Sequence, residues 1–390
     1  MHAAQKRQVY LDYSATTPVD QRVLDAMLPY FRETFGNPSS AHRYGKAAQQ
    51  AVEAARQTLA RLLHCRESEI VFTSGGTESD NLAIRGVAHA SRDKGNHIIT
   101  SQVEHAAVLK TCRLLEKEGF AVTYLPVDSH GRVDPDLVAG AIRKETILIS
   151  IIHGNNEVGT INPIQEIGAI ARQHGIPFHT DAVQSFGKVP LNLEEMPIDL
   201  LSLSSHKIYG PKGVGALFIR RGTPIQPILT GGGHEMGKRA GTHNVPGIVG
   251  LARAAEIMIT EMASERREIG ALRDYFWEQL RKRIDNVVLN GHPENRLYHN
   301  LNVSFPGCDG EALLMALDMF GIAVSTGSAC QSGSVEPSHV LKAMGLENDR
   351  GTSALRFTLG RYTTREDIDY TLEVLEQVVP QQRQAQRKRP

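Results

Sequence analysis

Apolar residues in the first 260 positions follow two alternating patterns, short runs rich in β-branched residues and longer stretches with helical spacing. The short runs predict strands at 70–73, 97–101, 121–126, 147–152, 177–180, 200–204 and 215–220. The longer stretches predict helices at 40–63, 78–91, 106–118, 135–142 and 164–174. Strands that alternate with helices are typical of a parallel sheet with helices on its faces, so we expect a large α/β domain over 16–260.

The pattern changes in the last third of the chain. A helical pattern runs over 245–283 and allows a break near Ala263. Beyond it, the sequence predicts strands at 300–305 and 354–359 and helices at 310–319 and 365–379. We expect a smaller α+β domain formed by residues 1–15 and 261–380. Residues 381–390 are polar and basic without an apolar face, which predicts a disordered tail or a docking segment for a partner.

Composition limits the classes of function. The 390 residues are 41% hydrophobic and 22% charged, as in ordinary globular proteins. Lys and Arg number 43, as do Asp and Glu, so no overall charge attracts nucleic acid or an anionic membrane. The first residues lack the apolar core of a signal peptide, and no apolar run approaches the ~18 residues of a membrane span. We therefore expect a cytoplasmic protein that binds neither membrane nor nucleic acid.

The four cysteines lie far apart and form no CxxC pair, which argues against a zinc cage or a disulfide framework. Cys330 differs from the others because its neighbours in VSTGSACQSGS are small and polar, so nothing large can pack around the thiol. Chance placement is one interpretation. The other is a reactive nucleophile on a flexible segment, whose reactivity depends on access and on its thiolate fraction.

Polar residues follow the predicted strands at their carboxyl ends, where ligands of open α/β sheets bind. Residues 74–77, Ser-Gly-Gly-Thr, join a strand to a helix and would present main-chain N–H groups to an anion such as phosphate. A capped turn is an equal alternative. His105 and Asp181 each follow another strand; with His179 they could ligate a metal, but no HExxH or comparable spacing supports this, and no metal site is expected.

Lys207 comes after an apolar strand and directly follows Ser204, Ser205 and His206 in the sequence. A lysine in a pocket loses its proton readily, which the formation of a Schiff base requires. A lysine for an aldehyde, a carboxylate for a ring nitrogen, an aromatic side chain for stacking and donors for a phosphate together indicate pyridoxal 5′-phosphate. A metal hydrolase would not need the lysine.

Motifs along nearly the whole chain resemble those of the cysteine desulfurases of the NifS/IscS type, in the class V aminotransferase group of fold-type I pyridoxal phosphate enzymes. They are YLDYSATTPVD, FGNPSSAH, FTSGGTESDN, EHAAV, NNEVGTINPI, HTDAVQ, SSHKIYGPKG, GTHNV, GSACQSGSVEPSHVL and ALRFTLGR. The resemblance implies a fold-type I transferase with a mainly parallel, seven-stranded sheet. It also implies that sulfur is removed from L-cysteine to give L-alanine.

The resemblance assigns roles to individual residues around the cofactor. Lys207 is similar to the lysine that holds the cofactor, Asp181 to the partner of the ring nitrogen, and His105 to the imidazole stacked on the ring. Gln184 and Asn156 resemble the groups near the ring hydroxyl. The phosphate cradle would comprise Gly76, Thr77, Ser204, His206 and, from the second subunit of a homodimer, Thr242.

Substrate and sulfur would be held by a second group of residues. Arg356 resembles the clamp for the substrate carboxylate, supported by Asn37 and Asn156, and a planar guanidinium suits that task. A surface arginine on an edge strand is the alternative. His234 and Met236, in TGGGHEMGKRAG, stand where the family commonly has Gln and Arg.

Cys330 resembles the cysteine whose thiolate takes the substrate sulfur as a persulfide and passes it to an iron–sulfur scaffold or another sulfur acceptor. The surrounding glycine and serine residues would supply the freedom to move. His105 is a candidate acid or base for the thiol. The alternatives are a selenocysteine lyase on the same scaffold, a catalytically silent protein that presents Cys330 to sulfur-relay partners, and, more distantly, a metal hydrolase.

Overall fold

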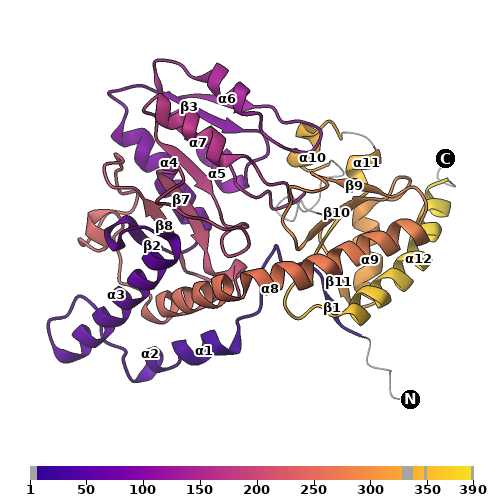
Figure 1. Ribbon diagram of the computed structural model, residues 1–390, viewed down its shortest axis with the longest axis horizontal. Coiled ribbons are helices and arrows are strands. Elements are labelled where there is room, and N and C mark those ends of the chain that lie inside the picture. The colour runs from indigo at the N-terminus through magenta and orange to yellow at the C-terminus, as the bar shows by residue number, and fades with distance from the viewer. Residues whose placement is uncertain (1–6, 327–336, 347–348, 388–390) are drawn as a thin grey trace.

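The computed structural model describes residues 7–326, 337–346 and 349–387. A large group of strands and helices and a smaller one lie side by side, and one long helix runs beneath both (Figure 1). No described helix combines the length and the apolar character that crossing a membrane requires.

The large group is built on a sheet of seven strands, in the order β2-β8-β7-β6-β5-β3-β4. β8 runs antiparallel to both of its neighbours, and the other neighbouring pairs are parallel. The strands are β2 (Ile70–Thr73), β3 (His97–Ser101), β4 (Ala121–Leu125), β5 (Thr146–Ser150), β6 (Phe178–Asp181), β7 (Leu200–Ser204) and β8 (Gly215–Ile219). The predicted α/β class with a mainly parallel seven-stranded sheet is confirmed.

Helices cover both faces of this sheet because successive side chains of a strand point to opposite faces. In β7, Leu201 and Leu203 belong to one hydrophobic cluster, and Leu200 belongs to another. The first cluster packs under α3 and α7, and the second under α4 and α5. The bounds of these helices are α3 (Arg43–Leu63), α4 (Gly76–Ala90), α5 (Ala106–Lys117) and α7 (Ile164–Gln173). A shorter helix, α6 (Pro135–Ala141), lies between β4 and β5 in the chain.

The long helix α8 (Val245–Arg283) joins the two groups without a break. Its first half contributes Leu251 and Met258 to the core of the large sheet, and its second half contributes Phe276 and Leu280 to the core of the small group. The break that the pattern allows near Ala263 does not occur. No glycine or proline lies between Gly250 and Gly270, so no residue there interrupts the main-chain hydrogen bonds of the helix. The helix therefore stays continuous where its buried side passes from one core to the other.

The small group contains an antiparallel sheet in the order β12-β10-β9 and a parallel pair, β1 with β11. The bounds of these elements are β1 (Val9–Tyr10), β9 (Val288–Asn290), β10 (Asn300–Ser304), β11 (Ile322–Ala323) and β12 (Ala354–Thr358). The remaining helices are α1 (Gln21–Met27), α2 (Pro29–Arg32), α9 (Gly310–Met319), α10 (His339–Ala343), α11 (Asp349–Thr352) and α12 (Arg365–Arg387). Because Val9 and Leu11 are buried in the core of the small group, the start of the chain packs with its end.

The helix α12 extends further than the sequence predicts. It continues past Pro380 to Arg387, over most of the segment that composition predicts to be disordered. The guanidinium of Arg383 donates to the carbonyl oxygens of Pro306 (3.0 Å), Asp285 (2.9 Å) and Asn286 (3.0 Å). These contacts with distant loops order a helical turn whose own composition offers no apolar face.

Candidate active site

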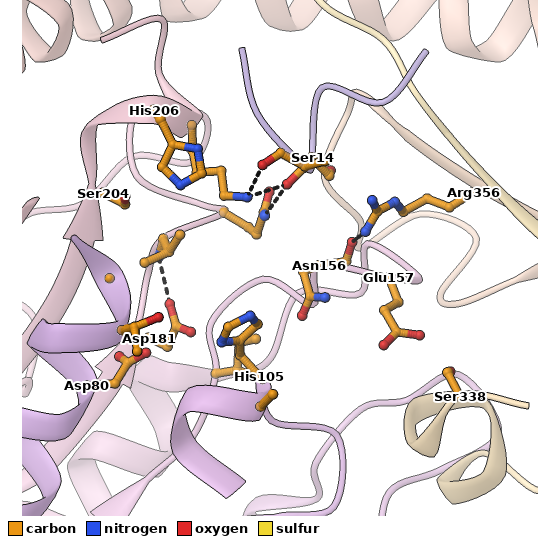
Figure 2. Close-up of a pocket in the computed structure, with 18 of the residues that line it drawn as sticks. Ser14, Asp80, His105, Asn156, Glu157, Asp181, Ser204, His206, Ser338 and Arg356 are labelled. Atoms are coloured by element: carbon orange, nitrogen blue, oxygen red, sulfur yellow. Dashed lines mark hydrogen bonds between the residues drawn. The ribbon is translucent and has the colours of Figure 1, made fainter. Parts of the chain in front are cut away.

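A cavity of about 380 Å³ lies at the carboxyl ends of the strands of the large sheet, where the small group closes over it. Figure 2 shows its lining side chains converging from both groups. Ten of the predicted site residues line it: Gly76, Thr77, His105, Asn156, Asp181, Gln184, Ser204, His206, Lys207 and Arg356.

Lys207 points into this cavity from the turn that follows β7. Its Nζ donates to the carbonyl oxygens of Ser14 (2.6 Å) and Ala15 (2.8 Å). Burial lowers the pKa of Lys207 to about 7, and the positive charges of Arg356 and Lys188 act in the same direction. An amine that is largely unprotonated near neutral pH is the nucleophile that addition to an aldehyde requires.

Two buried carboxyl groups face the opposite wall. Asp181 ends β6, and its Oδ1 accepts from the main-chain N–H of Val183 at 2.9 Å. The carboxyl groups of Asp181 and Asp80 and a ring nitrogen of His105 lie within 4.8 Å of one another. Burial raises the pKa of Asp80 and that of Asp181, and Asp80 is raised further by Asp181. A bound cationic group would relieve this repulsion, and a protonated ring nitrogen is such a group.

The sequence analysis considered His179 as a metal ligand together with His105 and Asp181. In the structure, Asp80 and not His179 lies beside those two residues. His179 is fully buried instead, with Nδ1 2.8 Å from the hydroxyl of Ser150 and Nε2 3.0 Å from the hydroxyl of Ser202. Asp80 went unnoticed because it lies inside α4, one turn after the glycine-rich loop, where an acidic residue normally faces solvent.

His105 stands at the start of α5 and faces the cavity (Figure 2). Its Nδ1 accepts from the main-chain N–H of Ala107 at 3.2 Å, so this nitrogen carries no proton and the ring caps the helix. Burial lowers the pKa of His105, Asp181 opposes this effect, and Lys207 adds to it. A neutral, oriented imidazole suits both stacking on a flat ring and proton transfer.

A second hollow of about 380 Å³ continues from the cavity at the N-terminus of α4. Both hollows share Gly76, Thr77, Ser204 and His206. A Cβ at Gly76 would lie 2.6 Å from Cγ2 of Val183, so only glycine leaves the main chain this close to the wall. The hydroxyl groups and the main-chain N–H groups at the N-terminus of this 15-residue helix are suited to binding an anion.

Two buried amide oxygens in the cavity lack a hydrogen-bond partner in the part of the chain that the structure describes. Oδ1 of Asn156 and Oε1 of Gln184 form no hydrogen bond with any described residue. The amide nitrogen of Gln184 donates to the carbonyl oxygen of Ser14 at 3.0 Å. Because an unpaired buried polar atom costs about 1–3 kcal/mol, these oxygens indicate a ligand with hydrogen-bond donors. The lining therefore fits a group with a phosphate, a cationic ring nitrogen, a hydroxyl and an aldehyde.

Arg356 reaches the cavity from β12 and is buried. It donates through Nη1 to the carbonyl oxygen of Asn156 (2.8 Å) and through Nη2 to Oδ1 of Asp12 (2.7 Å). Its Nε has no partner among the described residues. The guanidinium is therefore held rigidly with donors to spare for a carboxylate.

Two predicted site residues, Asn37 and Thr242, do not line this cavity. Asn37 is exposed, and its Oδ1 accepts from the main-chain N–H of Ser39 at 2.9 Å. Thr242 is exposed in the loop before α8. Cys330 lies outside the described residues. Other lining residues, which sequence reasoning missed, are Ser14, Asp80, Glu157, Ser338 and His339.

The loop that departs from the family pattern surrounds a buried ion pair. Glu235 accepts from Arg56 at 2.8 and 3.0 Å, from the N–H of Phe72 at 2.7 Å and from Nε2 of His243 at 2.5 Å. Burial acts to raise its pKa, but the hydrogen bonds from His243 and Arg56 lower the pKa of Glu235 to about 2. Next to it, Nε2 of His234 lies 3.1 Å from the hydroxyl of Ser39.

Comparison with known proteins defines the class. The chain matches the aminotransferase class-V family model over residues 9–371 and belongs to this family, whose enzymes use pyridoxal 5′-phosphate.

Proteins named as cysteine desulfurases are similar over almost the whole chain. "Cysteine desulfurase IscS" of Dictyoglomus turgidum is 56% identical over 374 residues, 96% of this chain and 95% of the relative. The protein of the same name from Methanosarcina thermophila is 54% identical over 377 residues, 97% and 93% of the two chains. Among solved structures, a NifS-like protein matches with a TM-score of 0.91 at 41% identity, over 96% of this chain and 100% of that one. "SspA in complex with cysteine" matches with a TM-score of 0.82 at 41% identity, over 92% and 100%.

Proposed function

We propose that this protein is a cysteine desulfurase that uses pyridoxal 5′-phosphate to convert L-cysteine into L-alanine and protein-bound sulfur. The observation that carries the proposal is the buried, weakly basic Lys207, which faces Asp181 across a cavity that also holds Arg356. The relatives named as cysteine desulfurases support the choice of substrate.

The residues present fit the cofactor, and each would have a defined task. Lys207 would hold the aldehyde carbon, Asp181 the protonated ring nitrogen, and His105 one face of the ring. The hydroxyl and N–H groups at the start of α4 would hold the phosphate. When bound, the cofactor supplies an electron-withdrawing ring that acidifies the Cα–H of an attached amino acid. Lys207 Nζ, once displaced by the substrate amine, would then take and return that proton.

We assign the sulfur transfer to Cys330. Its thiolate would attack the substrate sulfur, so that an S–S bond forms while the C–S bond to Cβ breaks, and the carbon skeleton gains a proton and leaves as L-alanine. Described residues on both sides of its segment either line the cavity or bond to a residue that lines it. Ser325 exchanges main-chain hydrogen bonds with Arg356 at 3.2 and 2.6 Å, and Ser338 lines the cavity. These contacts of the flanking residues support the assignment of the sulfur transfer to Cys330.

A homodimer accounts for the two residues found outside the cavity. Asn37 and Thr242 have no place in the cavity of their own chain, but a second copy would bring them to it. The segment that precedes Asn37 carries three exposed, large apolar side chains. Leu28, Phe31 and Phe35 are 54%, 56% and 64% exposed, and large apolar side chains gathered on a surface mark an interface. We further propose that the sulfur passes to an iron–sulfur scaffold or another thiolation partner in the reducing cytoplasm.

Borohydride reduction followed by peptide mapping tests the cofactor attachment. We expect the label on Lys207 and no trapped cofactor in Lys207→Ala. A label on another lysine, such as Lys212, would contradict the assignment.

A second measurement separates the alternatives. Cys330→Ala should keep its bound cofactor but form no persulfide from L-cysteine, because the attacking thiol is gone. Turnover of selenocysteine that survives in Cys330→Ala would favour a selenocysteine lyase. A purified wild-type protein that cannot be loaded with pyridoxal 5′-phosphate would favour a silent sulfur-relay protein.

A further inference from the structure

Lys188 is a buried ammonium group with an unusual set of partners. It follows β6 by a short turn and is only 7% exposed. Its Nζ donates to the carbonyl oxygens of Gln184 (3.2 Å) and Lys207 (3.1 Å). Among the described residues it forms no salt bridge, and both of its hydrogen bonds go to main-chain carbonyl oxygens. Such a group is costly, and a function is the usual reason for its presence.

The two carbonyl oxygens belong to residues that line the cavity. Gln184 and Lys207 are 23 positions apart in the chain, yet one ammonium group bridges their main chains. The main chain beyond Lys207 is also constrained, because Tyr209 adopts a left-handed conformation with φ of +62°. Lys188 therefore helps to fix the direction in which Lys207 leaves its turn.

The charge of Lys188 also reaches the Lys207 amine. After burial and Arg356, Lys188 is a further cause of the lowered pKa of Lys207. Burial lowers the pKa of Lys188 itself to about 8, and the charge of Glu265 opposes this effect. Lys188 thus keeps most of its charge at neutral pH and disfavours a second positive charge on Lys207.

We propose that Lys188 is a positioning residue for Lys207: its ammonium group ties the main chains of Gln184 and Lys207 together and places a buried positive charge beside the turn that carries Lys207. This inference rests on the proposed function, because it requires Lys207 to hold the cofactor. Lys188 itself does not line the cavity.

The pH titration of the visible absorbance band of the loaded enzyme tests the proposal. Removing a buried positive charge should make the Lys207 nitrogen easier to protonate. At an effective dielectric constant of about 20, a unit charge about 10 Å from a titrating nitrogen shifts its midpoint by about one pH unit. We therefore expect the midpoint to rise by that amount in Lys188→Met and in Lys188→Gln, of which the latter retains an amide donor for the two carbonyl oxygens. The other charged or titratable groups that act on the Lys207–Lys188 pair are unchanged in both variants: Asp12, Asp181, Glu265, His105, His206, His299 and Arg356.

Two further variants complete the experiment. Lys188→Arg keeps the charge and should restore the wild-type midpoint, which a purely steric role would not predict. Lys94→Met removes an exposed lysine from the turn between α4 and β3 and should leave the midpoint unchanged. An unaltered midpoint in Lys188→Gln, or in a folded and loaded Lys188→Met, would overturn the proposal. A wild-type protein without the visible band, or with its cofactor trapped on another lysine, would instead refute the proposed function.

Discussion

Replacing Arg356 with lysine tests whether this side chain grips the carboxylate of the substrate. A guanidinium has five N–H donors in a fixed fork. In Arg356, one donor goes to Asn156 at 2.8 Å and another to Asp12 at 2.7 Å, which leaves Nε and the remaining N–H groups for two parallel bonds to a carboxylate. An ammonium group has only three donors, so after serving both of those partners it retains one.

The loss in Arg356→Lys is therefore one charge-assisted hydrogen bond of two. Such a bond contributes about 1.5–3 kcal/mol, which corresponds to a decrease in kcat/KM of about 10- to 150-fold. Because the carboxylate is held equally before and during the reaction, the decrease should appear mainly as a higher KM. The assay measures alanine formed at increasing L-cysteine concentrations by enzyme with its full content of cofactor.

The methyl ester of L-cysteine serves as the internal control, because it lacks the negative charge that Arg356 is expected to bind. Its KM should be nearly the same in the wild type and in Arg356→Lys. Arg350→Lys provides a matched protein control, since Arg350 bonds to Leu289 and Asn290 in the small group. An Arg356→Lys enzyme with an unchanged KM for L-cysteine would refute the assignment of the clamp.

Two further predictions concern the cofactor and the stability of the fold. In Gly76→Ala, the new Cβ would lie 2.6 Å from Cγ2 of Val183. Overpacking of this kind costs about 1–3 kcal/mol, so cofactor binding should weaken about 5- to 150-fold. The cofactor that remains bound after dialysis is measured by its absorbance. Gly140→Ala, with no atom within 4 Å of the new Cβ, should bind normally, and equal retention in both variants would contradict the cradle. Glu235→Gln leaves the buried Arg56 without its anion and should lower the free energy of unfolding, measured by urea titration, by about 3–5 kcal/mol. Glu53→Gln removes an exposed partner of the same arginine and should lower the free energy of unfolding by about 1 kcal/mol or less. Because the pKa of Glu235 is lowered from 4.5 to about 2 in the folded state, the stability that Glu235 contributes should be complete above about pH 4.5 and disappear as the pH falls toward 2. A difference in stability between the wild type and Glu235→Gln that does not change with pH over this range would refute the reasoning.

Much of the fold follows from patterns that act over a few residues. The period of apolar positions determines where β7 and the helices beside it form, because a strand such as Leu200–Ser204 can bury both faces only inside a sheet covered on both sides. Lys207 and Asp181 are recognisable for the same reason. Each follows such a strand directly, and the carboxyl ends of parallel strands lie at one edge of the sheet.

Contacts between distant residues could not be predicted in this way. Asp12 and Arg356 are 344 positions apart, and only the packing of the start of the chain against the small sheet brings them together. The last helical turns of α12 depend in the same way on Arg383 and the loops it reaches.

The sequence by itself determined the periodicity of the elements and the residue types at the strand ends, because both reflect local backbone geometry and side-chain chemistry. Only the tertiary structure decided which charges share a buried environment, such as Asp80 beside Asp181 and Lys188 behind Lys207. The physical reason is that pKa shifts and ion pairs depend on distance and burial in three dimensions, and spacing along the chain fixes neither.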